Sequence, residues 1–238
     1  GNTTVTIYED GTKIREYEDT PKIYFPESLD IKITNYCDVG CRYCHESSTI
    51  KGKHADLEKL KEILSDLQSG VELAIGGGNC LAHPFLTDFL IWCKNKGFIC
   101  NITVNQQHLP KYRDLIVYLI KDDLVKGVGI SINNNNFEEI KELKKISNNI
   151  VYHLIIGIHD ISIIDELKKI GDCKILLLGY KQFGRGINYY SKKVEDNITN
   201  WEKSVPLYFG KVLLAFDNLA VEQLNLQSKL SKKIWDQC

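Results

Sequence analysis

Methionine is absent from the 238 residues, and proline occurs only five times. No apolar run reaches the roughly 20 residues that cross a bilayer, and the first residues have neither the basic nor the apolar region of a secretory signal. Neither charge dominates, since 30 lysines and arginines stand against 31 aspartates and glutamates. No overall field therefore draws the chain to nucleic acid or to an acidic membrane.

Cysteine is the residue with an uneven distribution. Of the eight cysteines, five are scattered and three are close together, at Cys37, Cys41 and Cys44. This pattern is unlike the disulfide framework of a small secreted domain, so we expect a cytoplasmic protein. The hydrophobic content of 43% and the charged content of 26% are ordinary for a globular protein with a large core.

The three clustered thiols indicate a metal centre. Thiolates favour soft metals, which means zinc or an iron–sulfur cluster. A [4Fe–4S] cluster held by Cys37, Cys41 and Cys44 would keep one iron open to a ligand. A zinc site would need a fourth ligand, for which His45 or His54 is available. Structural zinc sites usually pair two dyads, and the sequence has one triad without a partner dyad, so the cluster is the favoured interpretation.

Apolar runs alternate with helical patterns from residue 29 to about residue 180. The alternation predicts parallel βα units, and six units favour a partial barrel over a closed eight-stranded one. The predicted strands cover residues 29–34, 71–75, 98–104, 125–132, 150–156 and 173–178. The predicted helices cover residues 55–68, 85–96, 110–121, 137–146 and 162–170.

Three parts are expected along the chain: a lead-in at residues 1–28, a core barrel at 29–185 and an extension at 186–238 that packs on the core. The lead-in contains a β-hairpin around an Asp-Gly turn. The extension is a strand–helix unit, and its last predicted helix has no capping sequence before Cys238, which suggests a C-terminus that continues further. The remaining predictions are a glycine-rich loop at 180–188, helices at 196–209 and 220–235, and a strand at 211–216.

In this context the cysteine triad resembles the cluster loop of the radical S-adenosylmethionine (SAM) superfamily. The match consists of the Cys-x3-Cys-x2-Cys spacing, the aromatic Tyr43 before the last cysteine, and the position after the first predicted strand. The resemblance covers about residues 29–185 and implies an α/β fold with a partial (β/α)6 barrel. It also implies that Cys37, Cys41 and Cys44 hold a [4Fe–4S] cluster whose open iron SAM chelates.

The same resemblance implies an enzyme. One electron from an external donor of the flavodoxin or ferredoxin type would cleave SAM to methionine and a 5′-deoxyadenosyl radical, which abstracts hydrogen from a substrate. The sequence does not identify that substrate, a peptide or a small metabolite, or any catalytic residue that touches it. The alternative is a non-catalytic zinc- or iron–sulfur-binding α/β protein with a regulatory role.

A glycine turn after the second predicted strand adds to the resemblance. Gly77-Gly78-Asn79-Cys80 resembles the superfamily's Gly-Gly-Glu-Pro segment, which holds the amino group of SAM. Glycine lets the backbone approach the ligand closely. Asn79 replaces the usual Glu and Cys80 the usual Pro, so a charged hydrogen-bond acceptor is lost. By resemblance, Gly77, Gly78 and Asn79 bind the amino end of SAM, and the two departures keep the non-catalytic alternative open.

Polar residues at two further strand ends are candidates for SAM contacts. Ser131 and Asn133 end the fourth predicted strand, and Arg185 lies in a Gly-Arg-Gly loop after the sixth, where members of the superfamily carry similar residues. The alternative for Ser131 and Asn133 is capping of the next helix. The alternative for Arg185 is an ordinary solvated loop arginine.

Overall fold

The computed structural model describes residues 2–8 and 13–236, which form an α/β fold. Strands β3 to β9 are hydrogen-bonded in a seven-stranded sheet that follows the order of the chain, while β1 and β2 form a sheet of their own. The predicted α/β class is confirmed, and so is each predicted strand, with shifts of one or two residues at the ends. The seven strands are β3 (Ser28–Thr34), β4 (Glu72–Gly77), β5 (Ile99–Asn105), β6 (Gly127–Ser131), β7 (Ile150–Ile155), β8 (Lys174–Leu178) and β9 (Leu213–Phe216).

The chain divides into two compact units. Unit 1 comprises Gly1–Val39, Ser48–Gly129 and Glu138–Ile150, and unit 2 comprises Gly40–Ser47, Ile130–Phe137 and Val151–Cys238. Unit 1 therefore holds the first cysteine of the triad, and unit 2 holds the second and third. Across the residues that the structure describes, no helix combines the length and apolar character needed to cross a membrane.

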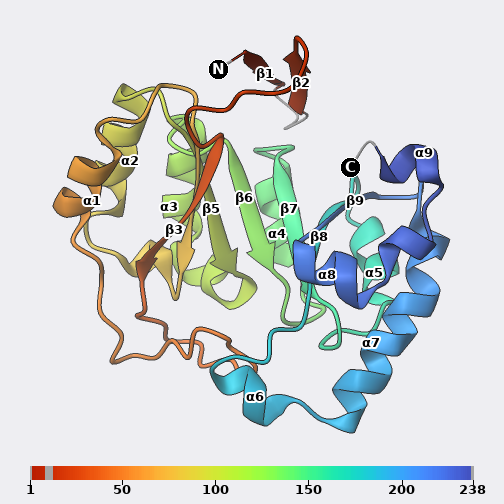
Figure 1. The fold of residues 1–238 in the computed structure, drawn as a ribbon. Helices are drawn as coiled ribbons and strands as arrows, with labels where there is room; N and C mark the ends of the chain where they lie inside the picture. Colours follow the sequence, from red (N-terminus) through yellow and green to blue (C-terminus); the bar gives the residue numbers. More distant parts are fainter. Residues whose placement is uncertain (1, 9–12, 237–238) are drawn as a thin grey trace. The chain divides into compact units, whose positions relative to one another are not determined.

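Unit 1 contains three parallel-paired strands and their covering helices. β3 pairs with β4, and β4 with β5, all in parallel. On β4 and β5 every second side chain is buried, as expected for strands with one face under helices. One of these helices, α2, lies against β5 (Figure 1). The helices of unit 1 are α1 (Leu57–Leu64), α2 (Leu86–Asn95), α3 (Leu109–Lys121) and α4 (Glu138–Lys144), with the short 3₁₀ turns η1 (Cys80–Ala82) and η2 (Gln106–His108).

The N-terminal hairpin of unit 1 is also confirmed. β1 (Thr3–Ile7) and β2 (Lys13–Tyr17) pair antiparallel, and the predicted turn between them lies outside the described residues. Ion pairs from Lys13 and Arg15 join β2 to the rest of unit 1. The Lys13 Nζ lies 2.7 Å from a Glu72 oxygen, and the Arg15 guanidinium binds both oxygens of Glu27 at 2.6 and 2.8 Å.

Unit 2 contains the paired ends of β7, β8 and β9, again in parallel. The Asp217 side chain caps the helix that follows β9 by accepting from the Ala220 N–H at 2.7 Å, and the same oxygen accepts from the Gly179 N–H at 2.9 Å. This carboxylate therefore joins the loop after β8 to that helix. The helices of unit 2 are α5 (Ile163–Lys168), α6 (Arg185–Tyr189), α7 (Lys192–Ser204), α8 (Asn218–Gln223) and α9 (Lys232–Trp235), with 3₁₀ turns η3 (Val205–Tyr208) and η4 (Leu226–Ser228).

Two predictions for the C-terminal third were wrong. The loop expected at residues 180–188 contains the start of α6. The single helix expected at 220–235 is broken into α8, η4 and α9, because Asn225 adopts a left-handed conformation with φ 48° and Ser231 begins a new helix by accepting from the Ile234 N–H. Asparagine tolerates that conformation better than most residues. The helical spacing of the apolar residues does not show where such a residue interrupts the helix.

Burial of His153 on β7 predicts a pH-dependent stability. Burial lowers the pKa of His153 to about 4, whereas a histidine in an unfolded chain titrates near pH 6.5 (about that value in model peptides). Between these two values the unfolded state binds more protons, so the free energy of unfolding falls as the pH is lowered from 6.5 toward 4. We expect His153→Leu to reduce the loss between pH 7 and pH 5 by at most about 2 kcal/mol. Urea denaturation at the two pH values measures this, and an identical loss in both proteins would contradict it.

Candidate functional site

The carboxyl end of β4 lies directly against the start of the cysteine loop in unit 1. The Gly78 N–H donates to the Thr34 carbonyl at 2.8 Å, and the Asn79 N–H donates to the Tyr36 carbonyl at 2.6 Å. A Cβ on Gly78 would collide with the Tyr36 carbonyl oxygen, and Gly77 has a φ of 122°, which side chains rarely allow. The two glycines therefore permit a backbone approach that no larger residue would.

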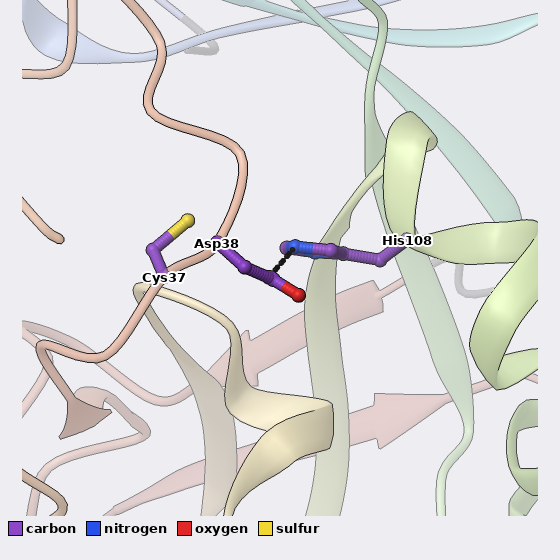
Figure 2. Close-up of side chains that lie close together, drawn as sticks. All are labelled: Cys37, Asp38 and His108. Carbon is purple, nitrogen blue, oxygen red and sulfur yellow. Dashed lines mark hydrogen bonds and ion pairs between the residues drawn. The ribbon is translucent and has the colours of Figure 1, made fainter. Parts of the chain in front are cut away.

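Cys37 begins the loop, and the residue after it is part of a polar cluster. The Cys37 N–H donates to the Thr49 carbonyl at 3.0 Å. One oxygen of Asp38 accepts from the His108 Nε2 at 2.8 Å and from the Asn79 amide nitrogen at 3.2 Å. Figure 2 shows the Asp38 carboxylate pointing to the His108 ring, which comes from the segment before α3. A ligand atom of each of Cys37, Asp38 and His108 lies within 4.8 Å of the others.

Hydrogen bonding sets the charges in this cluster. Burial opposes the ionisation of Asp38, but hydrogen bonds from its own backbone N–H, from Asn79 and from His108 outweigh that effect and hold its pKa below the ordinary value. Burial lowers the pKa of His108, although the bond to Asp38 opposes this. At neutral pH the carboxylate is therefore ionised, and the imidazole is neutral with its proton on Nε2.

Two buried atoms of the cluster have no hydrogen-bond partner among the described residues. They are the Asn79 Oδ1 and the His108 Nδ1, in residues that are 2% and 3% exposed. The Asp38 carboxylate can only accept, so the Asn79 NH₂ faces it and the amide oxygen is the atom that remains. Buried acceptors without donors are rare in native proteins and indicate a missing partner.

The second half of the cysteine loop is held by Arg185 in unit 2. The Arg185 N–H donates to the Cys44 carbonyl at 3.0 Å, and its Nε donates to the Cys41 carbonyl at 2.9 Å. The Cys44 N–H also donates to the Cys41 carbonyl, at 3.2 Å, which closes a turn. The arginine at the start of α6 is therefore a residue that fixes the loop backbone, and its predicted contact with SAM stays a prediction.

Asn133 also reaches the cysteine loop in unit 2. Its amide nitrogen donates to the Tyr43 hydroxyl at 3.0 Å. Burial raises the pKa of Tyr43 to about 12, so the hydroxyl is protonated at neutral pH. Ser131, the third polar candidate, is the last residue of β6. The roles of Ser131 and Asn133 toward SAM stay predictions.

The structure explains the cysteine at position 80 and gives contacts for His54, one of the two histidines considered as a zinc ligand. Cys80 is buried, its Sγ donates to the Thr103 carbonyl at 3.4 Å, and burial raises its pKa to about 12, so it is a protonated core thiol. The Nδ1 of His54 lies 2.9 Å from the Thr34 hydroxyl, and its ring packs edge-on against His83 at 4.8 Å. These contacts favour a packing role for His54.

Sequence reasoning missed Asp38 and His108. Asp38 follows Cys37 directly, and His108 follows the third predicted strand, where the carboxyl ends of parallel strands carry functional residues. Both positions were available as signals. What the sequence lacked was the contact between them, which joins residues 70 positions apart.

A cavity of about 560 Å³ lies elsewhere in unit 1. It is lined by the hairpin, by the lead-in around Tyr24 and by Val71 and Ile99, at the amino ends of β4 and β5. The polar cluster is at the carboxyl end of the same strands, so this cavity does not belong to the site.

Comparison with known proteins identifies the family. Residues 31–205 match the Radical SAM superfamily. The chain belongs to this superfamily. The resemblance read from the cysteine loop and the glycine turn is thereby confirmed for most of the chain.

Solved structures of similar fold include SuiB from Streptococcus suis. SuiB bound to the precursor peptide SuiA is 16% identical with a TM-score of 0.61, over 84% of this chain and 52% of SuiB. SuiB bound to S-adenosylmethionine is 15% identical with a TM-score of 0.61, over 82% and 51% of the two chains. At such low identity the likeness concerns the fold, and the chain spans about half of SuiB.

A curated relative matches a shorter stretch. A probable GTP 3′,8-cyclase from Methanothermobacter thermautotrophicus is 33% identical over 90 residues, which make up 36% of this chain and 29% of the relative. The match is too short to assign that activity to this chain.

The glycines at the end of β4 allow a matched pair of variants. We expect Gly78→Ala to lower the free energy of unfolding by about 1–3 kcal/mol, because the new methyl group would displace the Tyr36 carbonyl. Gly76→Ala is the control, since its Cβ would lie at an ordinary 3.8 Å from the Thr103 Cβ, and a change within about 1 kcal/mol is expected. Denaturant unfolding of both variants measures the difference, and equal effects would contradict the close backbone approach.

Proposed function

We propose that the chain is a radical SAM enzyme in which Cys37, Cys41 and Cys44 hold a [4Fe–4S] cluster and SAM occupies the open iron. The observation that carries the proposal is a three-thiolate loop in a chain of this superfamily. When bound, the cluster and SAM supply an electron and a 5′-deoxyadenosyl radical for abstraction of a substrate hydrogen.

The residues present fit these groups. None of the three thiols is in a disulfide and each is half-buried, which suits ligands that a metal must reach. The Cys41 and Cys44 carbonyls are bound by Arg185, which fixes the backbone that carries these thiols. In unit 1 the buried, unpartnered oxygen of Asn79 is an acceptor for an N–H donor, as the amino group of SAM would be. We therefore retain Gly77, Gly78 and Asn79 as contacts to that amino end, with Ser131, Asn133 and Arg185 as further polar contacts.

The proposal also includes partners and a location. An electron donor of the flavodoxin or ferredoxin type would supply the reducing electron, and the reducing cytoplasm is the compartment in which free thiols persist. The substrate is a peptide or a small molecule. The two relatives support different classes, since SuiB is solved with a precursor peptide and the other relative is a probable GTP cyclase.

A non-catalytic metal protein is the second candidate function. It is favoured by the donor set of Cys37, Asp38 and His108, whose ligand atoms lie within 4.8 Å of one another and suit zinc as well as iron. In that case the metal would bind Cys37 together with the Asp38 oxygen and the His108 nitrogen, and not together with Cys41 and Cys44. Metal content separates the two functions.

Replacement of Cys41 tests the proposed function. We expect Cys41→Ala to abolish both the iron–sulfur absorbance after anaerobic reconstitution and the formation of 5′-deoxyadenosine with dithionite and SAM, because a cluster with two protein thiolates is not retained. Cys173→Ala, at a buried thiol just before β8, is the matched control and should retain both. One tight zinc and no iron after anaerobic purification would instead favour the non-catalytic function.

A further inference from the structure

We propose that Asp38 supplies the carboxylate that accepts a hydrogen bond from the amino group of SAM, and that Asn79 and His108 position this carboxylate. The inference rests on the proposed function and adds a residue to its binding site. It follows from where charge and unpaired acceptors lie in unit 1.

The charge argument begins at residue 79. The superfamily's Gly-Gly-Glu-Pro segment resembles Gly77-Gly78-Asn79-Cys80, so the usual carboxylate is replaced by a neutral amide. The Asn79 amide nitrogen lies 3.2 Å from the Asp38 carboxylate. An amide and a carboxylate are therefore still paired at this point, with the charge on residue 38. An N–H donor gains more from a carboxylate than from a neutral amide oxygen.

The unpaired Asn79 Oδ1 also points to a ligand that donates hydrogen bonds. The Asn79 Oδ1 is buried and has no donor among the described residues. The amino nitrogen of a SAM that chelates the open iron would give its lone pair to the metal and keep two N–H donors and no acceptor. It would therefore bond this oxygen and the carboxylate together. A ligand with only acceptors would leave the amide oxygen unsatisfied.

His108 restricts the position of the carboxylate. The His108 Nε2 donates to one Asp38 oxygen at 2.8 Å, and the Asn79 amide nitrogen donates to the same oxygen at 3.2 Å. The second Asp38 oxygen lies 3.6 Å from the Lys111 Nζ. The histidine is 4% exposed at its side chain and the lysine 63%. The bond from the buried histidine therefore orients the part-exposed carboxylate, and the exposed lysine contributes little because solvent screens it.

Two other roles for Asp38 make different predictions. In a purely structural ion pair with His108 and Lys111, its charge would affect stability and not ligand choice. As a metal ligand with Cys37, it would affect iron content. A test that measures affinity for SAM and iron content separately distinguishes the three roles.

The experiment measures equilibrium binding of SAM to the cluster-loaded protein without reductant, so that no turnover occurs. We expect Asp38→Asn, which keeps the size of the side chain, to weaken SAM binding about 10- to 100-fold by loss of a charge-assisted hydrogen bond. Iron content should stay at the wild-type value. An analogue of SAM that lacks the α-amino group should bind the variant and the wild type equally.

Two further variants sharpen the test. The double variant Asp38→Asn/Asn79→Asp exchanges the carboxylate and the amide of this hydrogen-bonded pair, so the charge lies on residue 79. It should recover most of the affinity for SAM. Lys111→Ala is the matched control, because it removes the other charged neighbour of Asp38 and should not weaken binding. The double variant also keeps the proposal testable if the single variant is poorly folded.

The outcomes separate this inference from the proposed function. Wild-type protein with an intact cluster that fails to bind SAM would overturn the proposed function, and the inference with it. If the wild-type protein binds SAM and Asp38→Asn binds it with the same affinity, the inference alone is overturned. Loss of iron in Asp38→Asn, or an equal loss of affinity for SAM and for the analogue, would also overturn it, because Asp38 would then act on the metal or on the fold.

Discussion

Backbone hydrogen bonds between the end of β4 and the start of the cysteine loop are the contact on which the site in unit 1 depends. The N–H groups of Gly78 and Asn79 bond carbonyls on either side of Asn35, within 2.8 Å. These bonds fix two neighbouring chain segments without using any side chain. Asp38 and Asn79 are thereby brought within hydrogen-bond distance, and a side chain at Gly77 or Gly78 would collide with the backbone of the loop start.

Most of the fold was predictable because its signals are local. Short segments rich in apolar residues mark the strands, and all seven strands of the large sheet lie within one or two residues of their predicted ends. The C-terminal helices were less predictable. The apolar spacing at residues 220–235 is helical throughout, but a single left-handed residue, Asn225, interrupts it. Periodicity describes which face is buried and does not show where the backbone turns.

The same distinction applies to the candidate site. The cysteine triad could be recognised because its three residues are neighbours in sequence, and their role as cluster ligands stays a prediction. The glycine turn was predictable because its conformation requires glycine. The Asp38–His108 pair was not, since it joins residues from the cysteine loop and from the turn after β5. Asn79 was recognised as a departure from the superfamily pattern, but only the folded chain shows a carboxylate beside it.

The hydrogen bonding of Asn79 bears on whether the replacement of Glu by Asn at this position weakens the binding site. A buried amide oxygen without a donor costs about 1–3 kcal/mol relative to a satisfied one, and the chain carries this cost at a position where the backbone is tightly fixed. A residue that only filled space could be an apolar side chain of similar size at no such cost. The amide nitrogen is used on Asp38, and the oxygen becomes satisfied only when a donor arrives. A buried oxygen that is satisfied only by an added donor has the energetic character of a binding site. This supports the proposal that the carboxylate for the amino group of SAM has moved from residue 79 to residue 38.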